Sequence, residues 1–241
     1  MDQLEYALGV FAAHERYARV YLPSDFTVLE FGPGDSVATA VLAKVAGASR
    51  SWLVDQGAFA SRDLAGYQAL AQRVSSDPQF ESLEELLERC AATYLTAGVS
   101  SLAAVPSGSV DWVFSQAALE HVPLDEFDSL LHEIARVQRP GGVSTHRIDL
   151  RDHLGDGLHS LRFPTRVWES KLFRTSGFYT NRLRASEINR RFTACGFSIE
   201  TCELDRWPAP KLGRARIAHD LRGILDEDLL IRGIWLVVRR N

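Results

Sequence analysis

The feature that most constrains the fold is a glycine turn that follows one apolar segment and is answered by an acid after the next. The turn is Glu30–Gly34, which reads Glu-Phe-Gly-Pro-Gly, and Asp55 ends the apolar run Trp52–Val54. Two glycines let the backbone turn sharply off a buried strand and approach a ligand closely. An acid about 20 residues later is placed to accept ribose hydroxyls. The sequence therefore predicts a strand–turn–helix–strand unit that holds a nucleoside.

The turn departs from the dinucleotide-binding fingerprint in ways that narrow the ligand. Val37 stands where the third glycine would fall, and Asp35 puts a negative charge at the start of the helix. A pyrophosphate would be repelled there, because helix N-termini favour anions only when no like charge is fixed beside them. Glu30 adds a second carboxylate. The pattern favours an adenosyl ligand that lacks phosphate and carries an ammonium group.

From this turn onward the sequence resembles the class I S-adenosylmethionine-dependent methyltransferases. Ser109–Val122 looks like the fourth strand of that family with its following turn, and Leu131–Gly142 looks like the helix and Pro-Gly-Gly turn before its fifth strand. The resemblance implies a doubly wound, mostly parallel seven-stranded α/β sheet, with S-adenosylmethionine as cofactor. The implied cofactor-binding residues are Glu30, Gly32, Pro33, Gly34, Asp55, Gln56 and Ser115. The family's acid for the adenine amino group is missing from Thr96-Ala97-Gly98, which leaves that contact open.

Length and composition predict one globular domain over 1–241. The resemblance implies a cofactor-binding half at 28–150 and cap elements at 151–195 and 205–233. Strands are expected at 27–31, 51–55, 93–95, 110–114, 143–149, 197–204 and 234–238. Helices are expected at 3–21, lying over the cofactor side, and at 36–46, 124–137, 185–195 and 214–225. Two more should lie within 58–93, broken at Ser75–Pro78 with Pro78 beginning the second. Residues 151–182 are expected to be irregular.

Composition limits the setting and the partners. Three cysteines show no metal-type spacing and suit a reducing compartment, and the N-terminus has neither a signal peptide nor a spanning segment, so we expect a cytoplasmic protein without a membrane partner. Residues 151–241 hold 17 Lys and Arg against 11 Asp and Glu, whereas residues 1–150 hold 10 against 20. A basic cap over an acidic half favours an anionic acceptor, unless the arginines only solvate helices.

Polar residues that could do chemistry follow the fifth strand. His146 is the preferred general base for a hydroxyl acceptor, and Asp149 is second because i and i+3 point to opposite faces of a strand. His121, after the fourth strand, is a third candidate, with pocket lining as its alternative role. His146, Asp149, Asp152 and His153 could instead hold a divalent cation. Spacing alone does not establish a metal site, and hydrogen bonds and ion pairs are the favoured alternative.

The segment Gly177–Arg184 combines aromatic, amide and guanidinium groups, which suit carbohydrate and anionic ligands. The candidate substrate-binding residues are His153, Tyr179, Asn181, Arg182 and Arg184. The region 146–195 also resembles bacterial methyltransferases of polysaccharide assembly, which implies O-methylation of a glycan or another small anionic molecule. The alternative is that this segment is core and surface.

Three other functions are alternatives to a small-molecule methyltransferase. A nucleic-acid methyltransferase is disfavoured because Ser115–Ala118 lacks the Asn/Asp-Pro-Pro-aromatic turn, and no Pro-Cys nucleophile is present. A dehydrogenase is disfavoured because no Tyr-x-x-x-Lys pair occurs. A non-catalytic protein that binds S-adenosylmethionine remains an alternative. The oligomeric state is open, and a homo-oligomer is allowed.

Overall fold

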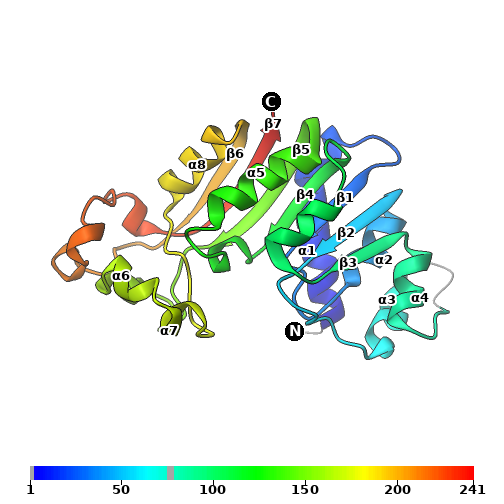
Figure 1. The fold of residues 1–241 in the computed structure, drawn as a ribbon, viewed down its shortest axis with the longest axis horizontal. Coiled ribbons are helices and arrows are strands. Elements are labelled where there is room, and N and C mark those ends of the chain that lie inside the picture. The colour runs from blue at the N-terminus through cyan, green and yellow to red at the C-terminus, as the bar shows by residue number, and fades with distance from the viewer. Residues whose placement is uncertain (1–2, 75–78) are drawn as a thin grey trace.

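The computed structural model describes residues 3–74 and 79–241, which form one seven-stranded sheet in the order β3-β2-β1-β4-β5-β7-β6 (Figure 1). The strands are β1 Thr27–Phe31, β2 Arg50–Val54, β3 Ala92–Leu95, β4 Val110–Gln116, β5 Gln138–Asp149, β6 Phe197–Arg206 and β7 Ile231–Arg240. The first five are parallel, and β7 runs antiparallel between β5 and β6. This is the class I methyltransferase arrangement, so the predicted fold is confirmed.

The central strands are buried on both faces, which explains why their sequences are almost wholly apolar. Leu29 of β1 lies beside Trp52 of β2 and Val113 of β4 in register. All three side chains are buried. Because β1, β2 and β4 are parallel, their carboxyl ends meet at one edge of the sheet. In an open parallel sheet this edge is where ligands bind.

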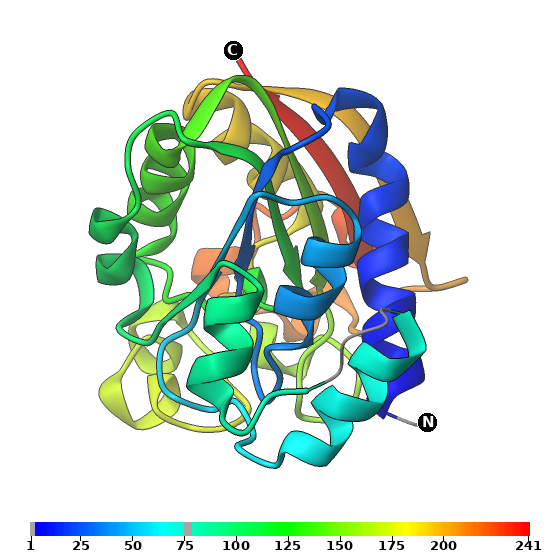
Figure 2. The ribbon, with the colours of Figure 1, turned by 90° about the vertical axis from the view of Figure 1, so that its right-hand side faces the viewer.

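Helices cover both faces of the sheet, and Figure 2 shows α1 and α5 on opposite sides of it. The longer helices are α1 Gln3–Ala18, α2 Ala38–Val45, α3 Leu64–Val74, α4 Leu83–Arg89, α5 Phe127–Val137 and α8 Ala185–Ala194. One core holds apolar side chains of α1 to α4, and the other holds those of α5, α8 and the 3₁₀ helix η2, Gly98–Ala104. Ser82 caps α4 through the backbone N–H of Glu85.

Helix α1 lies against β4, β5, α2 and α3. Its His14 is fully buried, and the two ring nitrogens lie 3.0 Å from Thr145 Oγ1 and 3.1 Å from Gln116 Oε1. Trp112 Nε1 donates to the same Thr145 hydroxyl at 3.0 Å. Gln116 is the last residue of β4, so His14 lies near the carboxyl end of that strand. The expectation that this helix lies over the cofactor side stays a prediction.

The cap differs from the prediction in its local structure. Residues 151–182 contain three short helices, namely η4 His159–Arg162, α6 Thr165–Trp168 and α7 Lys171–Arg174. The helix predicted over 214–225 is wrong: the chain makes separate 3₁₀ turns, η5 Arg214–Arg216 and η6 His219–Leu221. The first helix within 58–93 ends at Val74 and the second begins at Leu83. The predicted break at Ser75–Pro78 lies outside the described residues, but the prediction that Pro78 begins the second helix is wrong, because residues 79–82 are not helical and Ser82 is the N-cap.

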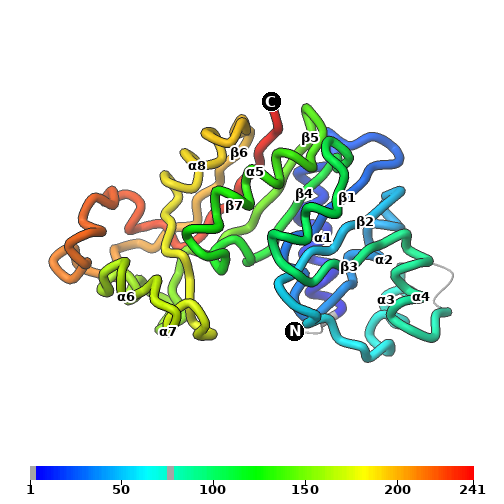
Figure 3. The backbone as a smooth tube through the Cα atoms, viewed as in Figure 1, coloured from blue at the N-terminus to red at the C-terminus, as the bar shows by residue number. Residues whose placement is uncertain are grey.

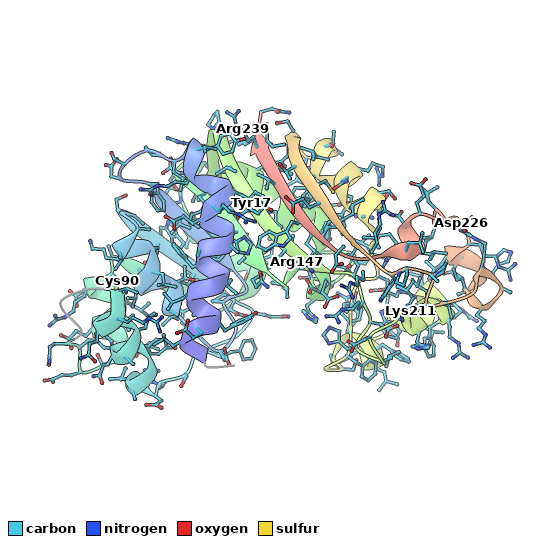
Figure 4. All side chains as sticks on the ribbon, turned by 180° about the vertical axis from the view of Figure 1, so that it is seen from behind. Tyr17, Cys90, Arg147, Lys211, Asp226 and Arg239 are labelled. Atoms are coloured by element: carbon cyan, nitrogen blue, oxygen red, sulfur yellow. The ribbon has the colours of Figure 1, made fainter. Side chains whose placement is uncertain are left out.

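The cap has a small apolar core of its own, formed by Leu158, Leu161, Trp207, Leu212, Ile217 and Leu229. Figure 3 shows the two cap segments, one after β5 and one between β6 and β7, lying together beyond the ends of those strands. In Figure 4, Lys211 and Asp226 of the cap lie at the opposite end of the molecule from Cys90, which follows α4. The edge of the sheet that carries the glycine turn lies between these two ends.

No helix among residues 3–74 and 79–241 is long and apolar enough to cross a bilayer.

Candidate functional site

A cavity of about 500 Å³ opens at the carboxyl ends of β1, β2 and β4. This volume lies in the range of small-molecule sites, roughly 300–1,000 Å³. Its lining comes from four segments: Phe31, Gly32 and Gly34; Val54–Gln56 and Phe59; Ala97–Ser100; and Ala117, Ala118, His121–Pro123 and Glu126. The structure therefore brings together the predicted Gly32, Gly34, Asp55 and Gln56. It adds His121 on the opposite wall.

The glycine turn is built for close approach. The Gly32 N–H donates to the Val54 carbonyl at 2.8 Å, which ties the turn to the end of β2. Gly32 has φ +81°, and a Cβ added there would lie 2.4 Å from the Cβ of Ala118. Any larger residue would push the turn and the loop after β4 apart, and both line the cavity.

Asp55 is 8% exposed and its carboxylate faces the glycine turn. One oxygen accepts from the backbone N–H of Gly34 at 2.7 Å, and the other accepts from the N–H of Gln56 at 2.6 Å. Each carboxylate oxygen has a second lone pair that these bonds do not use. The group is therefore held rigidly and can still accept hydroxyl donors from the cavity.

Glu30 and Pro33, predicted with the cofactor set, do not line the cavity. The Glu30 side chain is buried beneath the turn and hydrogen-bonds to Thr39. Burial raises the pKa of Glu30 to about 7, and the neighbouring Asp55 charge adds to the shift. Its expected role as a carboxylate facing an ammonium group is thus replaced by a role in supporting the turn.

His121 stands on the far wall with a defined tautomer. Its Nδ1 lies 3.0 Å from the backbone carbonyl of Tyr179. A carbonyl only accepts, so Nδ1 carries the proton and Nε2 of the neutral ring keeps its lone pair. Burial lowers the pKa of His121, as does the nearby His153, whose ring lies 5.1 Å away edge-on. The imidazole is therefore neutral near pH 7 and has a free basic nitrogen.

His146 and Ser115 are corrected as site residues. His146 is fully buried on β5, its Nδ1 lies 2.8 Å from Ser115 Oγ, and its ring packs on Phe192 of α8. Burial lowers the pKa of His146 to about 3. Neither residue lines the cavity, and neither exposes an atom to a ligand. The strand alternation that brings Thr145 to α1 turns His146 toward α8.

The predicted substrate arginines support the chain itself. Arg184 is 4% exposed and donates to the backbone carbonyls of Leu150, Asp228 and Ile231. Arg182 donates to the carbonyls of Ser160 and Phe163 and lies over the Trp168 ring. Both guanidinium groups are used inside the cap, so the prediction that they bind substrate is wrong.

Tyr179 and Asn181 are likewise structural. The Asn181 amide donates to the carbonyls of Leu119 and Val122, and the Tyr179 hydroxyl donates to Glu169 at 2.7 Å. Both side chains are buried. Their effect on the site is indirect, because they hold the segment after β4 that carries His121. Of the five predicted substrate residues, His153 is the one that is exposed, and it contacts His121.

Asp149 and Glu120 lie beside His121 but differ in protonation. Arg151 binds the Asp149 carboxylate through two nitrogens. Although burial opposes it, this pairing lowers the pKa of Asp149. Glu120 is buried, accepts from the Asp149 N–H at 3.3 Å, and has one oxygen without a partner. Burial raises the pKa of Glu120 to about 8, so this carboxyl is protonated at neutral pH.

We expect Glu120→Gln to gain stability over the unchanged protein as pH rises from 4.5 to 8. The unfolded chain releases the Glu120 proton near pH 4.5 while the folded protein keeps it to about 8, so stability is lost as pH rises through that window. Glutamine has no proton to lose, and the difference in unfolding free energy should grow by about 1 kcal/mol per pH unit. Urea unfolding at pH 5, 6.5 and 8 measures it. A difference that stays constant across pH would contradict a protonated Glu120.

Within the described ranges, no group of three or more His, Cys, Asp or Glu side chains is arranged to hold a metal ion.

Comparison with known families identifies a methyltransferase domain in this chain. Residues 29–145 match the family model of a methyltransferase domain, and this match covers the glycine turn, Asp55, His121 and most of β5. No curated protein sequence matches the chain. The matched segment is the half of the molecule that forms the cavity.

Solved structures with the same fold are distant in sequence. A methyltransferase of Methanosarcina mazei is 16% identical with a TM-score of 0.54, covering 92% of this chain and 95% of its own. The 1,6-didemethyltoxoflavin-N1-methyltransferase of Burkholderia thailandensis, solved with its substrate and S-adenosylhomocysteine, is 18% identical with a TM-score of 0.53, covering 99% and 78%. The [4+2]-cyclase SpnF is 15% identical with a TM-score of 0.54, covering 96% and 79%. Likeness at this level shows the fold.

The domain match and the sheet topology together show an S-adenosylmethionine-dependent methyltransferase. The residues that line the cavity also fit S-adenosylmethionine, independently of the domain match. The turn has no room for a Cβ at Gly32, and the fixed Asp55 carboxylate has lone pairs to spare for hydroxyl groups. Among the described residues that line the cavity none is Lys or Arg, and the carboxylates of Asp55 and Glu126 favour an ammonium group.

Phe59 and Ala117 are two of the cavity's lining residues that the sequence did not predict. Phe59 lines it from the loop after β2, only four residues beyond Asp55, and that spacing was the available signal. Ala117 also lines it and has φ +48°, a conformation rare for alanine. An Ala-Ala pair is not a turn signal in the sequence. The turn depends on the Ala117 N–H, which donates to the Arg147 carbonyl at 2.8 Å.

Proposed function

We propose that the protein methylates a hydroxyl group of a small molecule, with His121 as general base. The observation that carries this proposal is the His121 imidazole on the cavity wall, held by the Tyr179 carbonyl so that its Nε2 lone pair is free. An alcohol has a high pKa and must lose its proton as the new bond forms, which a neutral imidazole can accept.

The cofactor half of the cavity supports the proposal. Asp55 would accept the two ribose hydroxyls, and Gly32, Gly34 and Gln56 would bring backbone close to the nucleoside. When bound, S-adenosylmethionine supplies a methyl group activated by the sulfonium. The chain's own contribution is then to hold the acceptor in line and to exclude water, and positioning alone supplies much of the acceleration.

Neighbouring charges tune His121 for this role. Asp149, held ionised by Arg151, favours the charged imidazole once a proton has been accepted, whereas burial and His153 favour the neutral form beforehand. His153 is exposed beside the ring, so it would contact the acceptor as it enters. Tyr179 and Asn181 fix the loop that carries His121, and they serve as positioning residues.

Net charge favours a sugar or another anionic molecule as the acceptor. Residues 151–241 hold 17 Lys and Arg against 11 Asp and Glu, so basic residues are in excess there. Arg182 and Arg184 are used internally, but Arg162, Arg166 and Lys171 are exposed on the cap. A panel of matched sugars and sugar acids, assayed by release of S-adenosylhomocysteine, tests this preference: equal rates on glucosides and glucuronides would contradict it.

We expect His121→Ala to lower kcat about 100-fold on the best acceptor of that panel, at the lower end of general-base effects. His121→Gln keeps a donor for the Tyr179 carbonyl but has no base, so it should be as slow. The fall of kcat/KM toward acid, expected below pH 6.5 from the lowered pKa, should vanish in both. His132→Ala, on the exposed face of α5, is the matched control. Full activity of His121→Gln would exclude the proposed base.

A further inference from the structure

A second hollow lies on the face of the sheet that α1 covers, beside the end of β4. This groove of about 230 Å³ is lined by residues of α1 between Glu5 and Ala13, by Gln116 of β4 and by Trp235 of β7. Its volume is below the roughly 300–1,000 Å³ of drug-sized sites and suits a single ring. Gln116 is followed directly by Ala117, which lines the cofactor cavity. The groove therefore borders that cavity at the end of one strand.

A glycine in the middle of α1 leaves the groove open. Gly9 lines the groove, and nothing lies within 4 Å of a Cβ added there. Glycine inside a helix is less stable than alanine, and neither crowding nor a positive φ requires it at this position. The helix thus forgoes stability at a position where the missing side chain makes room for a ligand.

Two rings and an amide form the walls of the groove. Trp235 packs against the rings of His14 and Tyr17, with centroids 4.7 and 5.5 Å away, and stays partly exposed. Tyr6 is 51% exposed. Gln116 Oε1 accepts from His14 Nε2 at 3.1 Å, and the amide nitrogen of Gln116 has no hydrogen-bond partner among the described residues. A fixed amide donor beside a rigid indole ring suits a ligand ring that carries hydroxyl groups.

Arg147 brings a positive charge to the same face of the sheet. In register it lies between Gln116 of β4 and Trp235 of β7. Its guanidinium lies over Gly233, where an added Cβ would come within 3.0 Å of the Arg147 Cζ atom. Gly233 and Trp235 are two residues apart on one strand and so share a face. Figure 4 shows Arg147 between α1 and the cap.

The charge of Arg147 is only loosely compensated within the chain. Its Nη2 lies 3.6 Å from an Asp205 oxygen, and its Nη1 lies 3.4 Å from the carbonyl of the next residue. Asp205 has a closer contact to Arg232, at 2.9 Å. Glu5, the acid that lines the groove, pairs with Arg73. A guanidinium has five N–H donors in a planar fork, so Arg147 can still bind a carboxylate through two of them.

We infer that this groove binds the acceptor as a sugar acid, with the sugar ring against Trp235 and its carboxylate on Arg147. The inference rests on the proposed function, because it assigns the groove to the acceptor of that reaction. Asp149 lies two residues beyond Arg147 on the same strand face, and its charge acts on His121. The carboxylate of the acceptor and its reacting hydroxyl group are therefore bound beside neighbouring residues of β5.

The test titrates the protein, loaded with S-adenosylhomocysteine, with methyl β-D-glucuronide and with methyl β-D-glucoside. These two sugars differ only at the carboxylate, and saturation-transfer NMR gives both dissociation constants without turnover. We expect the glucuronide to bind at least tenfold more tightly, which is the scale of a hydrogen bond to a charged group. Arg147→Met should remove this preference and leave the affinity for the glucoside unchanged.

Arg239→Met is the matched control for Arg147→Met. Arg239 lies on the same face of β7 but over Tyr21, beyond the other end of α1, so its loss should leave the preference for the glucuronide intact. Equal affinities of the two sugars in the unchanged protein would overturn the inference, as would a preference that survives in Arg147→Met. Benzoate that binds more tightly than the glucuronide would overturn the sugar ring as the occupant.

Gly9→Leu tests the position of the site independently of charge. Leucine favours a helix and its Cβ meets no neighbour there, so the variant should keep at least the Tm of the unchanged protein. It should weaken both sugars tenfold or more and leave S-adenosylhomocysteine binding unchanged, because Gly9 does not line the cofactor cavity. Full glucuronide affinity in Gly9→Leu would overturn the groove as the site.

The failure of this inference is distinguishable from the failure of the proposed base. His121→Gln should bind the glucuronide with unchanged affinity, because the groove does not include His121. An active His121→Gln enzyme whose glucuronide affinity still depends on Arg147 would contradict the base and support the groove. Loss of kcat in His121→Gln, together with an Arg147→Met protein that still prefers the glucuronide, would support the base and overturn the groove.

Discussion

Gly32→Val should weaken S-adenosylhomocysteine binding at least 100-fold. The first atom of the new side chain would lie 2.4 Å from the Cβ of Ala118, and φ at this position is +81°, which a β-branched residue avoids. The collision forces apart the turn after β1 and the loop after β4, which are two walls of one cavity. Backbone strain of this kind costs about 1–3 kcal/mol before any contact with the ligand is lost. Calorimetry of the purified variant measures the effect.

Gly34→Ala is the matched control. Gly34 also has a positive φ, +66°, but nothing lies within 4 Å of an added Cβ. Its loss of affinity should therefore be limited to the strain of the left-handed backbone and should be smaller than that of Gly32→Val. Equal losses in the two variants would mean that backbone conformation, and not the contact with Ala118, makes Gly32 necessary.

Arg184→Met should lower the free energy of unfolding by about 3 kcal/mol or more. The guanidinium donates to carbonyls of three segments, namely Leu150 after β5, Asp228 in the cap and Ile231 at the start of β7. A buried acceptor that loses its partner costs about 1–3 kcal/mol, and methionine fills the space but cannot donate. Burial lowers the pKa of Arg184 to about 10, so the group stays charged throughout the neutral range.

The comparison variant for Arg184 lies on the same helix. Arg190 is exposed, and within the described part of the chain its ion pair is with Glu187, three residues earlier. Exposed pairs contribute about 0–1 kcal/mol, so Arg190→Met should change stability little. Denaturant unfolding of both variants gives the result directly. If Arg184→Met unfolds at the same denaturant concentration as the unchanged protein, the arginine is free for a ligand after all.

The parallel strands and the cofactor turn could be predicted because their signals are local. Two glycines before a helix, and an acid after the next apolar run, lie within 26 residues of one another. The strand order then follows from the connections between strands. The prediction of a helix over 214–225 was wrong although its apolar residues have a helical spacing. Ile217 and its neighbours fill the small core of the cap from separate turns.

The acceptor side could not be predicted because polar residues serve ligands and backbone equally well. Arg184 was predicted to contact the substrate. In the structure it binds three backbone carbonyls that lie up to 47 residues away in sequence, and no local pattern indicates such partners. His146 lies near the carboxyl end of β5 as predicted, but strand alternation turns its ring toward Phe192 of α8 and away from the cavity. His121 was only a third candidate for the base. Its free basic nitrogen depends on a hydrogen bond to a carbonyl 58 residues later in the sequence, which the sequence does not reveal.

The buried histidine of α1 restricts how that helix can sit. Gln116 Oε1 can only accept, so His14 Nε2 donates to it, and Nδ1 of the neutral ring accepts the proton of the Thr145 hydroxyl, whose oxygen also accepts from the Trp112 indole. Burial lowers the pKa of His14 to about 4, so the arrangement persists through the neutral range. A shift of α1 by one helical turn would break both hydrogen bonds of the buried His14 ring and would leave the proton of the buried Thr145 hydroxyl without its acceptor. The helix therefore has a single register on the sheet. This register also fixes the side chain of Gln116, which is next in sequence to the cavity residue Ala117.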